Sequence, residues 1–370
     1  MQNKLLFLLL IISSTIYAQE ITFPYVEKEG WPIVEVRINN HNYNFLFDTG
    51  AAMTVVNSNL FKGLIQTGEI ELVDFNRVVE STSTTVLSEI SLAQKKFLNH
   101  EVVFKDLGAI NKVLCDVKLD GILGIDLMKD YLVEVDSQKQ IINFFKKKSF
   151  DYTMLKNYSK NNYKHSIPNL KLKIGNQKRY AVFDTGNNDG LTVSDHKLAS
   201  FINKNSHFKS YGRGSIGANS TKERTYQTEI INVKLEIGKL DIDHQNLSLN
   251  THQENNAGFD FIKQFDFFLD VTDQVIYLKK SPYAKSNSSP VIQYGFWVFY
   301  NFETNQFYVS NIAENNEQLR LGDILTQINT IDFPQEFCDL SAFLKKNMAT
   351  EMSLTIIRNG NEKSIEYSYN

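Results

Sequence analysis

A seven-residue segment that occurs twice constrains this chain more than any other feature. Residues 44–50 read Asn-Phe-Leu-Phe-Asp-Thr-Gly and residues 180–186 read Tyr-Ala-Val-Phe-Asp-Thr-Gly, so that Asp48 and Asp184 lie 136 residues apart. In each copy an apolar strand runs into an aspartate, a threonine and then a glycine that permits a sharp turn. Two carboxylates held close together cannot both ionise, and a pair that shares one proton can act as general base and general acid in one cycle. Each copy can therefore supply half of one active site.

The sequence around the two aspartates repeats at nearly the same period. Residues 38–40 correspond to residues 174–176, and each segment is expected to be a turn between two strands. Residues 124–131 correspond to residues 258–265, with glycine, aspartate and lysine in register. An alternating strand pattern follows both of these later segments. We therefore predict two lobes built on one duplicated plan.

These motifs resemble those of the aspartic peptidases of the pepsin and retropepsin superfamily. The matching pieces are the two Asp-Thr-Gly turns and the apolar-apolar-Gly segment at residues 122–124, and the resemblance covers about residues 30–280. It implies a mainly β fold of two retropepsin-like double-ψ β-barrel lobes with a peptide cleft between them. It also implies that Asp48 and Asp184 activate a water molecule that attacks the scissile carbonyl group.

The resemblance implies further roles for the residues that follow each aspartate. Thr49 and Thr185 are expected to brace the two turns against each other through hydrogen bonds. Gly50 and Gly186 are expected to offer backbone N–H donors to the carboxylates.

The chain departs from the pepsin-like pattern three residues after each aspartate, where that family usually has serine or threonine and this chain has Ala51 and Asn187. With one fewer donor on the ionised form, we expect a dyad that is less acidic than that of pepsin and active nearer to neutral pH. The second lobe also has Asn-Ala-Gly at residues 256–258 in place of apolar-apolar-Gly. Residues 187–190 resemble a small insertion after the second turn.

A polar hairpin in each lobe stands where the family has its flap, the mobile hairpin that closes over substrate. In the first lobe, residues 76–87 predict two strands around a polar tip, and the counterpart in the second lobe is residues 211–218. The candidate substrate-binding residues are Ser81, Thr82, Ser83, Gly214 and Ser215. Two ordinary surface hairpins are the alternative interpretation.

Length and composition are those of a folded protein with more than one domain. A chain of 370 residues is too long for one ordinary core, so two or three domains are expected. The hydrophobic fraction of 42% and the charged fraction of 22% are typical of soluble proteins. The net charge of −3 predicts no particular affinity for nucleic acid or for an anionic membrane.

The N-terminal residues have the pattern of a secretory signal peptide. Residues 1–18 combine a positive start, a short apolar centre and a small final residue, Ala18. The apolar centre is too short for a comfortable membrane span, although an uncleaved anchor is the alternative. We therefore expect an exported protein, in the periplasm, at the cell surface or secreted, with no membrane span after cleavage.

The chain has only two cysteines, Cys115 and Cys338, and they fall in different predicted domains. We therefore do not expect a disulfide framework to hold the protein together. No Cys or His cluster has the spacing of a zinc site, so no metal and no cofactor are expected.

The C-terminal residues resemble a PDZ domain of the bacterial type. A strand pattern at residues 307–312 leads to Leu-Arg-Leu-Gly-Asp-Ile-Leu at residues 319–325, and we expect a helix over residues 335–346 and then a hairpin with an Asn-Gly turn. The expected carboxylate-binding loop comprises Gly295, Phe296, Trp297 and Val298. The resemblance implies that a peptide, often a free C-terminus, adds to the sheet along the strand that follows this loop. A module that only packs against the protease is the alternative.

These features together predict the division of the chain and its activity. The predicted segments are a signal peptide (1–18), an N-terminal protease lobe (19–148), a C-terminal protease lobe (149–280), a linker (281–290) and a PDZ-like domain (291–370). We expect a monomeric exported aspartic endopeptidase whose PDZ domain recruits peptide or protein substrate. The alternatives are a catalytically silent peptide-binding protein and a surface scaffold.

Overall fold

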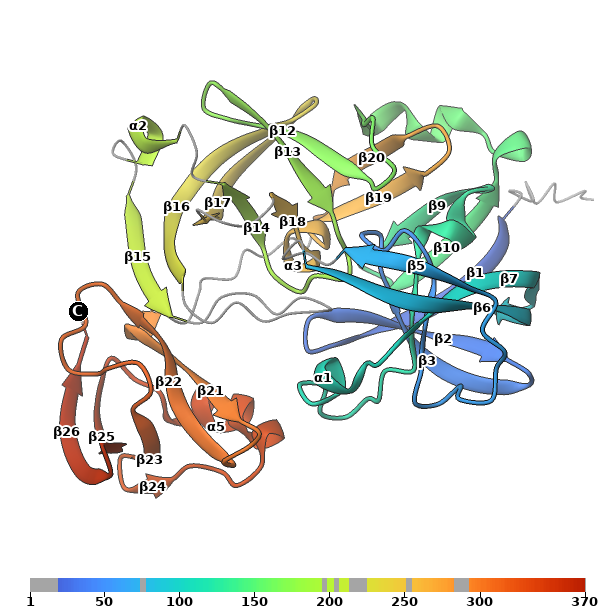
Figure 1. Cartoon of the computed structure of the whole chain (residues 1–370). Coiled ribbons are helices and arrows are strands. Elements are labelled where there is room, and N and C mark those ends of the chain that lie inside the picture. The colour runs from blue at the N-terminus through green and yellow to red at the C-terminus, as the bar shows by residue number, and fades with distance from the viewer. Residues whose placement is uncertain are drawn as a thin grey trace, which may run out of the picture.

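The structure, a computed structural model, is mainly β, and the helices among the residues that it describes are short (Figure 1). It describes residues 19–73, 78–194, 198–202, 206–212, 225–250, 255–282 and 293–369. The predicted signal peptide therefore lies outside the described residues. Within the described ranges, no helix is both long and apolar enough to cross a membrane.

One antiparallel sheet joins the first half of the chain to the second. Its strands, in spatial order, are β11 (Ser159–Asn162), β20 (Val275–Lys280), β19 (Phe265–Asp270), β9 (Tyr131–Asp136), β10 (Ile141–Lys146) and β1 (Gln19–Lys28). β9 and β19 pair in the middle of this sheet, with Val133 opposite Leu269. Because both of these residues are fully buried, the hydrophobic core is continuous between the two halves.

The stretch between the two halves contains regular secondary structure. It contains two 3₁₀ helices, η2 (Lys147–Ser149) and η3 (Tyr152–Asn157), and then β11 of the shared sheet. Phe150 packs against Phe145 and Phe268, and Lys147 forms an ion pair with Asp270. The Asp270 carboxylate that holds Lys147 is nearly buried, so this stretch is fixed to β19 of the shared sheet.

The first lobe is a sheet in which parallel and antiparallel strand pairs are mixed. Its strands, in spatial order, are β2 (Trp31–Ile38), β3 (His41–Phe47), β8 (Gly121–Leu123), β4 (Val55–Asn57), β7 (Lys95–Lys105), β6 (Val79–Leu92) and β5 (Gly68–Val73). β3 runs parallel to β8, β8 antiparallel to β4, and β4 parallel to β7. Asp48 follows β3 directly, so the pairing of β3 with β8 places the aspartate at the buried end of a strand.

The second lobe repeats this arrangement. Its strands, in spatial order, are β12 (Asn169–Ile174), β13 (Gln177–Phe183), β18 (Asn256–Ala257), β14 (Leu191–Ser194), β17 (Leu240–Asn250), β16 (Thr225–Ile237) and β15 (His207–Gly212). β13 runs parallel to β18, β18 antiparallel to β14, and β14 parallel to β17. The duplicated plan that the sequence repeat predicts is thus present in both lobes.

The flap prediction placed the hairpin tip of the first lobe too far along the chain. Ser81, Thr82 and Ser83 lie within β6, opposite Glu71, Ile70 and Glu69 of β5. The polar run is compatible with a strand because its threonines are β-branched. The residues that connect β5 to β6 include 74–77, which lie outside the described residues, as do Gly214 and Ser215 of the second hairpin.

The C-terminal residues form a further unit with its own buried cluster. Its elements are β21 (Phe296–Asn301), β22 (Gln306–Ala313), β23 (Ile324–Ile328), β24 (Ile331–Asp332), the 3₁₀ helix η4 (Phe337–Asp339), helix α5 (Leu340–Asn347), β25 (Glu351–Arg358) and β26 (Asn361–Ser368). Asn359 and Gly360, with φ angles of 54° and 77°, form the expected hairpin turn between β25 and β26.

The predicted carboxylate-binding loop is largely a strand. Phe296, Trp297 and Val298 belong to β21, and only Gly295 precedes it. Phe296 and Val298 point into the core, at 0% and 1% exposure. The apolar alternation of this stretch is that of a half-buried strand, which explains why it does not stay open as a loop.

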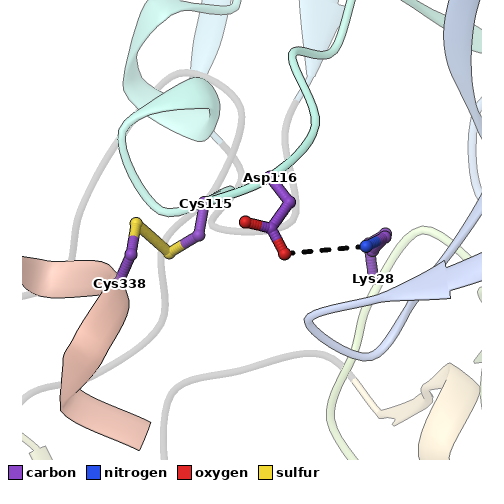
Figure 2. The surroundings of a disulfide bond; sticks show 4 residues. All are labelled: Lys28, Cys115, Asp116 and Cys338. Carbon is purple, nitrogen blue, oxygen red and sulfur yellow. Dashed lines mark ion pairs between the residues drawn. A yellow bond between two sulfur atoms is a disulfide. The ribbon is translucent and has the colours of Figure 1, made fainter.

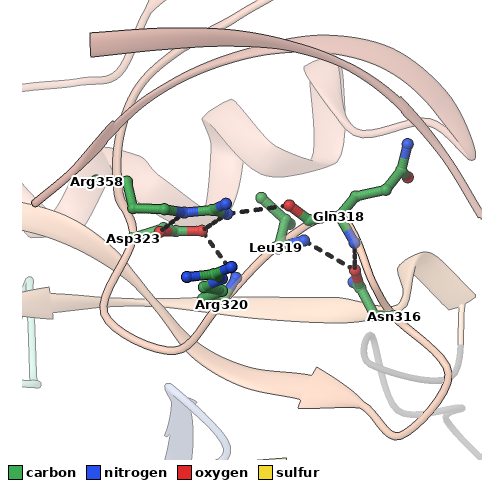
Figure 3. Close-up of polar contacts among 6 residues, drawn as sticks. All are labelled: Asn316, Gln318, Leu319, Arg320, Asp323 and Arg358. Atoms are coloured by element: carbon green, nitrogen blue, oxygen red, sulfur yellow. Dashed lines mark hydrogen bonds and ion pairs between the residues drawn. The ribbon is translucent and has the colours of Figure 1, made fainter. Parts of the chain in front are cut away.

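The run at residues 319–325 is fixed by a buried ion pair (Figure 3). The Arg358 guanidinium donates through Nε and Nη2 to the two carboxylate oxygens of Asp323, at 2.7 and 2.6 Å. Arg358 also donates to the Gln318 carbonyl oxygen, and the Arg320 backbone N–H donates to Asp323. A bidentate pair of this kind fixes the loop to β25 in one orientation.

Two attachments hold the C-terminal unit against the lobes. β22 pairs with β15 of the second lobe, with Tyr211 opposite Ile312. Cys338, next to α5, forms a disulfide with Cys115 of the first lobe (Figure 2). The sequence analysis, which expected no disulfide framework, did not foresee this bond. The bond connects the first lobe to the C-terminal unit, and sequence spacing could not reveal that contact.

Candidate active site

The two Asp-Thr-Gly turns meet in the structure. The carboxyl groups of Asp48 and Asp184 are in hydrogen-bonding contact, and both side chains are partly buried. Each turn also approaches the opposite carboxyl group through its glycine. A Cβ atom added to Gly186 would lie 2.3 Å from Cγ of Asp48, and one added to Gly50 would lie 2.6 Å from Cγ of Asp184. Glycine at these two positions is therefore what lets the aspartates come together.

Two buried threonines connect the turns reciprocally. The Thr49 backbone N–H donates to Oγ1 of Thr185 at 3.0 Å, and the Thr185 backbone N–H donates to Oγ1 of Thr49 at 3.1 Å. Each hydroxyl in turn donates to the carbonyl oxygen that precedes the opposite aspartate, that of Phe183 or Phe47. Because both threonine side chains are 0% exposed, these bonds do not compete with water.

Backbone N–H groups hold one oxygen of Asp48. Gly50 donates to Oδ1 of Asp48 at 2.7 Å, and Ala51 donates to the same atom at 3.1 Å. Among the described residues, no hydrogen bond is donated to Oδ2 of Asp48. The absence of a hydroxyl at residue 51 thus leaves this oxygen available to substrate, water or the shared proton.

Asp184 has a second donor that the sequence analysis did not assign. Gly186 donates its backbone N–H to Oδ1 of Asp184 at 2.9 Å, as in the first turn. The side-chain amide of Asn256 donates to Oδ2 of Asp184 at 2.8 Å. The expectation of one fewer donor was therefore wrong for Asp184, because Asn256 on β18 supplies the missing donor. The sequence does contain a signal for this donor, because Asn256 stands at a position of the repeat where an apolar residue is expected.

Burial and mutual repulsion make the dyad less acidic than free carboxyl groups. Burial raises the pKa of Asp48 well above its ordinary value, and the neighbouring charge of Asp184 raises it further. Burial also raises the pKa of Asp184, but hydrogen bonds from Asn256, Asp48 and the backbone oppose this rise. These directions favour a pair that holds one proton between them over part of the pH range.

The hairpin of β1 and β2 supports the second turn. The Trp31 indole N–H donates to the Gly186 carbonyl oxygen at 2.9 Å, and the Asn188 amide donates to the carbonyl oxygen of Glu29. The first lobe thus contacts the second turn directly through its N-terminal hairpin. Sequence analysis did not identify Trp31, because the contact joins residues 155 positions apart.

The structure therefore brings together only part of the predicted site. Asp48, Thr49, Gly50, Asp184, Thr185 and Gly186 form one cluster. Ser81, Thr82 and Ser83 belong to β6, where Thr82 and Ser83 line a cavity of about 430 Å³. This cavity is lined by residues of the first lobe and includes neither aspartate.

Comparison with known proteins supports the interpretation of the first lobe. No curated protein matches the chain. Among solved structures, the aspartic proteinase from Irpex lacteus is similar over 72% of this chain and 99% of its own, with 12% sequence identity and a TM-score of 0.47. Residues 34–127 match the family model of aspartyl proteases, a range that contains Asp48 but not Asp184. The first lobe of this chain thus carries the sequence signature of the aspartyl protease family.

Proposed function

We propose that this protein is an aspartic endopeptidase, which hydrolyses peptide bonds with a water molecule activated by Asp48 and Asp184. The observation that carries the proposal is the contact between two carboxyl groups from equivalent turns, held by the reciprocal bonds of Thr49 and Thr185. Because one chain supplies both carboxyl groups, we also propose that the monomer is sufficient for activity.

The proposed reaction needs one ionised and one protonated carboxyl group. The ionised group takes a proton from water, whose oxygen forms a bond to the scissile carbonyl carbon, while the other group gives its proton to the carbonyl oxygen. The resulting diol breaks its C–N bond as the first group passes its proton to the leaving nitrogen. The second group regains a proton from a diol hydroxyl as the new carboxyl group forms, so the dyad returns to its starting state.

The test of this proposal is cleavage of an unfolded protein by the full chain and by the Asp48→Asn and Asp184→Asn variants. We expect the wild type to cut internal bonds and a statine-containing peptide to inhibit it. Each variant should lose activity by about 10³-fold or more, because an amide can neither accept nor donate the proton that the reaction requires.

Asp243→Asn is the matched control, since this carboxylate is exposed and lies in the second lobe. It should retain wild-type activity. Equal cleavage by the wild type and both dyad variants would refute the proposal. A wild type that binds the inhibitor without cutting any substrate would favour the catalytically silent peptide-binding protein.

We also propose that the protein is exported, to the periplasm, the cell surface or the medium. The pattern of residues 1–18 supports this, and so does the Cys115–Cys338 bond, because disulfides persist mainly in oxidising compartments. N-terminal sequencing of the mature protein tests the proposal. The mature protein is expected to begin at Gln19, the residue after Ala18. Protein that stays in the cytoplasm and still begins with Met1 would contradict the proposal.

We further propose that the C-terminal unit acts as a PDZ-like domain that recruits peptide or protein substrate. Support comes from the order of its elements, with the Asp323 loop, α5 and the β25–β26 hairpin where the sequence resemblance expects them. Because Phe296 and Val298 are buried, we expect binding along β21 rather than capture of a carboxylate in an open loop. Peptides with a free or an amidated C-terminus should therefore bind equally, and a strict need for the free carboxylate would contradict this.

A further inference from the structure

We infer that Asn256 is a positioning residue that makes the dyad asymmetric, so that Asp184 is the ionised general base and Asp48 holds the shared proton. This inference rests on the proposed peptidase function and specifies which carboxyl group has which role. It follows from the direction of the hydrogen bonds around the two side chains.

A chain of three hydrogen bonds fixes the orientation of the Asn256 amide. The backbone N–H of Asp189 can only donate, and it donates to Oδ1 of Asn187 at 2.8 Å. The NH₂ group of Asn187 must then face Asn256, and it donates to Oδ1 of Asn256 at 3.1 Å. The NH₂ group of Asn256 is thereby directed to Oδ2 of Asp184, at 2.8 Å. The amide cannot flip without breaking this chain.

The backbone around Asn256 holds the side chain in place. β18 is paired on both sides, with Asn256 opposite Val182 of β13 and opposite Thr192 of β14. The residue is 0% exposed, so no water replaces its amide hydrogen bonds. Gly258 permits the close approach of the neighbouring loop, because an added Cβ atom would lie 2.3 Å from the Asp189 carbonyl oxygen.

The two carboxyl groups therefore differ in which oxygens are engaged. Both oxygens of Asp184 accept a hydrogen bond, from Gly186 and from Asn256. Asp48 accepts its two bonds on Oδ1 alone, and among the described residues none reaches Oδ2. A hydrogen-bond donor directed at each oxygen stabilises the ionised carboxylate. An oxygen that accepts no hydrogen bond can be protonated without the loss of one. The negative charge therefore belongs on Asp184 and the proton on Asp48.

Other acidic groups face this part of the site. Asp189 and Asp260 are acidic residues near Asp184, and Asp189 is exposed to solvent. Asp260 itself is paired with Lys263, which also contacts Glu27. An ionised carboxyl group at Asp189 or Asp260 can donate no hydrogen bond to Asp184. The donors that stabilise an ionised Asp184 include the Asn256 amide and the Gly186 backbone N–H.

The test is the pH profile of kcat/KM for the wild type and for Asn256→Leu, a change that removes the donor and keeps a similar volume. Without the amide, ionisation of Asp184 becomes harder, and the acid limb should move up by about one pH unit. The alkaline limb, which reports loss of the proton from Asp48, should keep its wild-type position. The bell-shaped pH profile of kcat/KM should therefore become narrower on its acid side only. Damage to the fold alone would instead lower activity at every pH.

A second change tests whether the donor itself is responsible. In the double variant Asn187→Thr with Asn256→Leu, a hydroxyl three residues after the aspartate can supply a donor to Asp184. The acid limb should return toward the wild-type position. Asn161→Leu is the matched control, because Asn161 is a buried asparagine that binds the backbone of Lys171 far from the dyad along the chain. It should lower the unfolding temperature and leave both limbs in place.

The same shift can be read without catalysis by ¹³C NMR titration of the aspartate carboxyl carbons. The lower of the two dyad pKa values should rise by about one unit in Asn256→Leu. An active wild type whose acid limb and titration are unmoved by this variant would overturn the inference and leave the peptidase function standing. An inactive wild type would refute the function, and the NMR titration would still decide the role of Asn256.

Discussion

At the residue scale, the catalytic candidates could be predicted from the sequence, but the residues that tune them could not. Asp48 and Asp184 stand at equivalent positions of a repeat, and the glycine that follows each one has a role in the turn that local geometry dictates. Asn256 reaches Asp184 from a strand that lies 72 residues further along the chain. Only the parallel pairing of β13 with β18 brings the two together, and a spacing in sequence does not reveal that pairing.

The raised pKa values of the dyad predict that Asp48→Asn stabilises the protein at neutral pH. The native state holds the proton of such a carboxyl group more tightly than the unfolded chain does. Stability is therefore lost as pH rises from the unfolded pKa, near 3.8, through the folded pKa of Asp48. The variant removes this loss, so its Tm at pH 7 should exceed that of the wild type by about 2–4 °C.

Thermal unfolding at two pH values checks this prediction. Near pH 3 the wild-type carboxyl group is protonated, and the advantage of Asp48→Asn should vanish. The exposed control Asp243→Asn should give no gain at either pH. An Asp48→Asn protein that is less stable than the wild type at pH 7 would show that the repulsion between the carboxyl groups is not a cost to the fold.

At the element scale, strands were easier to predict than the turns between them. Residues 76–87 were predicted to be two strands around a polar hairpin tip, yet residues 79–87 all belong to β6, whose first part pairs with β5. Thr84 and Thr85 are buried and donate hydrogen bonds to Glu101 and to the Ile65 carbonyl oxygen. Tertiary partners of this kind keep a polar segment in a strand, and they are not visible in the local sequence.

The junction between β15 and β22 depends on Gly212. A Cβ atom on this residue would lie 2.2 Å from the Ser310 carbonyl oxygen and 2.6 Å from Cα of Asn311. Both neighbours are backbone atoms, so Gly212→Val must separate the strands and should destabilise the protein by more than about 2 kcal/mol. Hydrogen exchange at the Glu314 amide, which donates to the Lys209 carbonyl oxygen at 2.9 Å, reports the separation.

The matched control is Gly63→Val, because an added Cβ atom at Gly63 meets no heavy atom within 4 Å. This variant should leave the exchange of the Glu314 amide at the wild-type rate. Equal protection of that amide in Gly212→Val and in the wild type would mean that the β15–β22 pairing does not hold the C-terminal unit.

At the scale of the whole molecule, the C-terminal unit is attached to both lobes. β-Strand pairing joins it to the second lobe, and the Cys115–Cys338 bond joins it to the first (Figures 1 and 2). The sequence predicted the unit from its own motifs, and these suggest a module at the end of a linker. Its attachment could not be predicted, since the cysteines are 223 residues apart and nothing local to either one indicates its partner.

Removal of the disulfide should destabilise the protein without abolishing the fold of the lobes. A bond that closes a loop of 223 residues restricts the unfolded chain, and its loss in Cys115→Ser should cost about 2–4 kcal/mol. Cys338→Ser and the double variant should cost the same, because each removes one and the same bond. Reductant should lower the unfolding midpoint of the wild type to that of the variants. Two reactive thiols in the unreduced, denatured wild type would contradict the bond.

The central claim is that Asp48 and Asp184 share one proton and use it to hydrolyse peptide bonds. The most direct measurement is kcat/KM of the wild type as a function of pH. Because the pKa values of both carboxyl groups are raised, the account predicts a bell with its acid limb above pH 3.8, the ordinary value of an aspartate, and a maximum nearer to neutral pH. Activity that peaks below about pH 3, or that rises to a plateau with no alkaline limb, would contradict it.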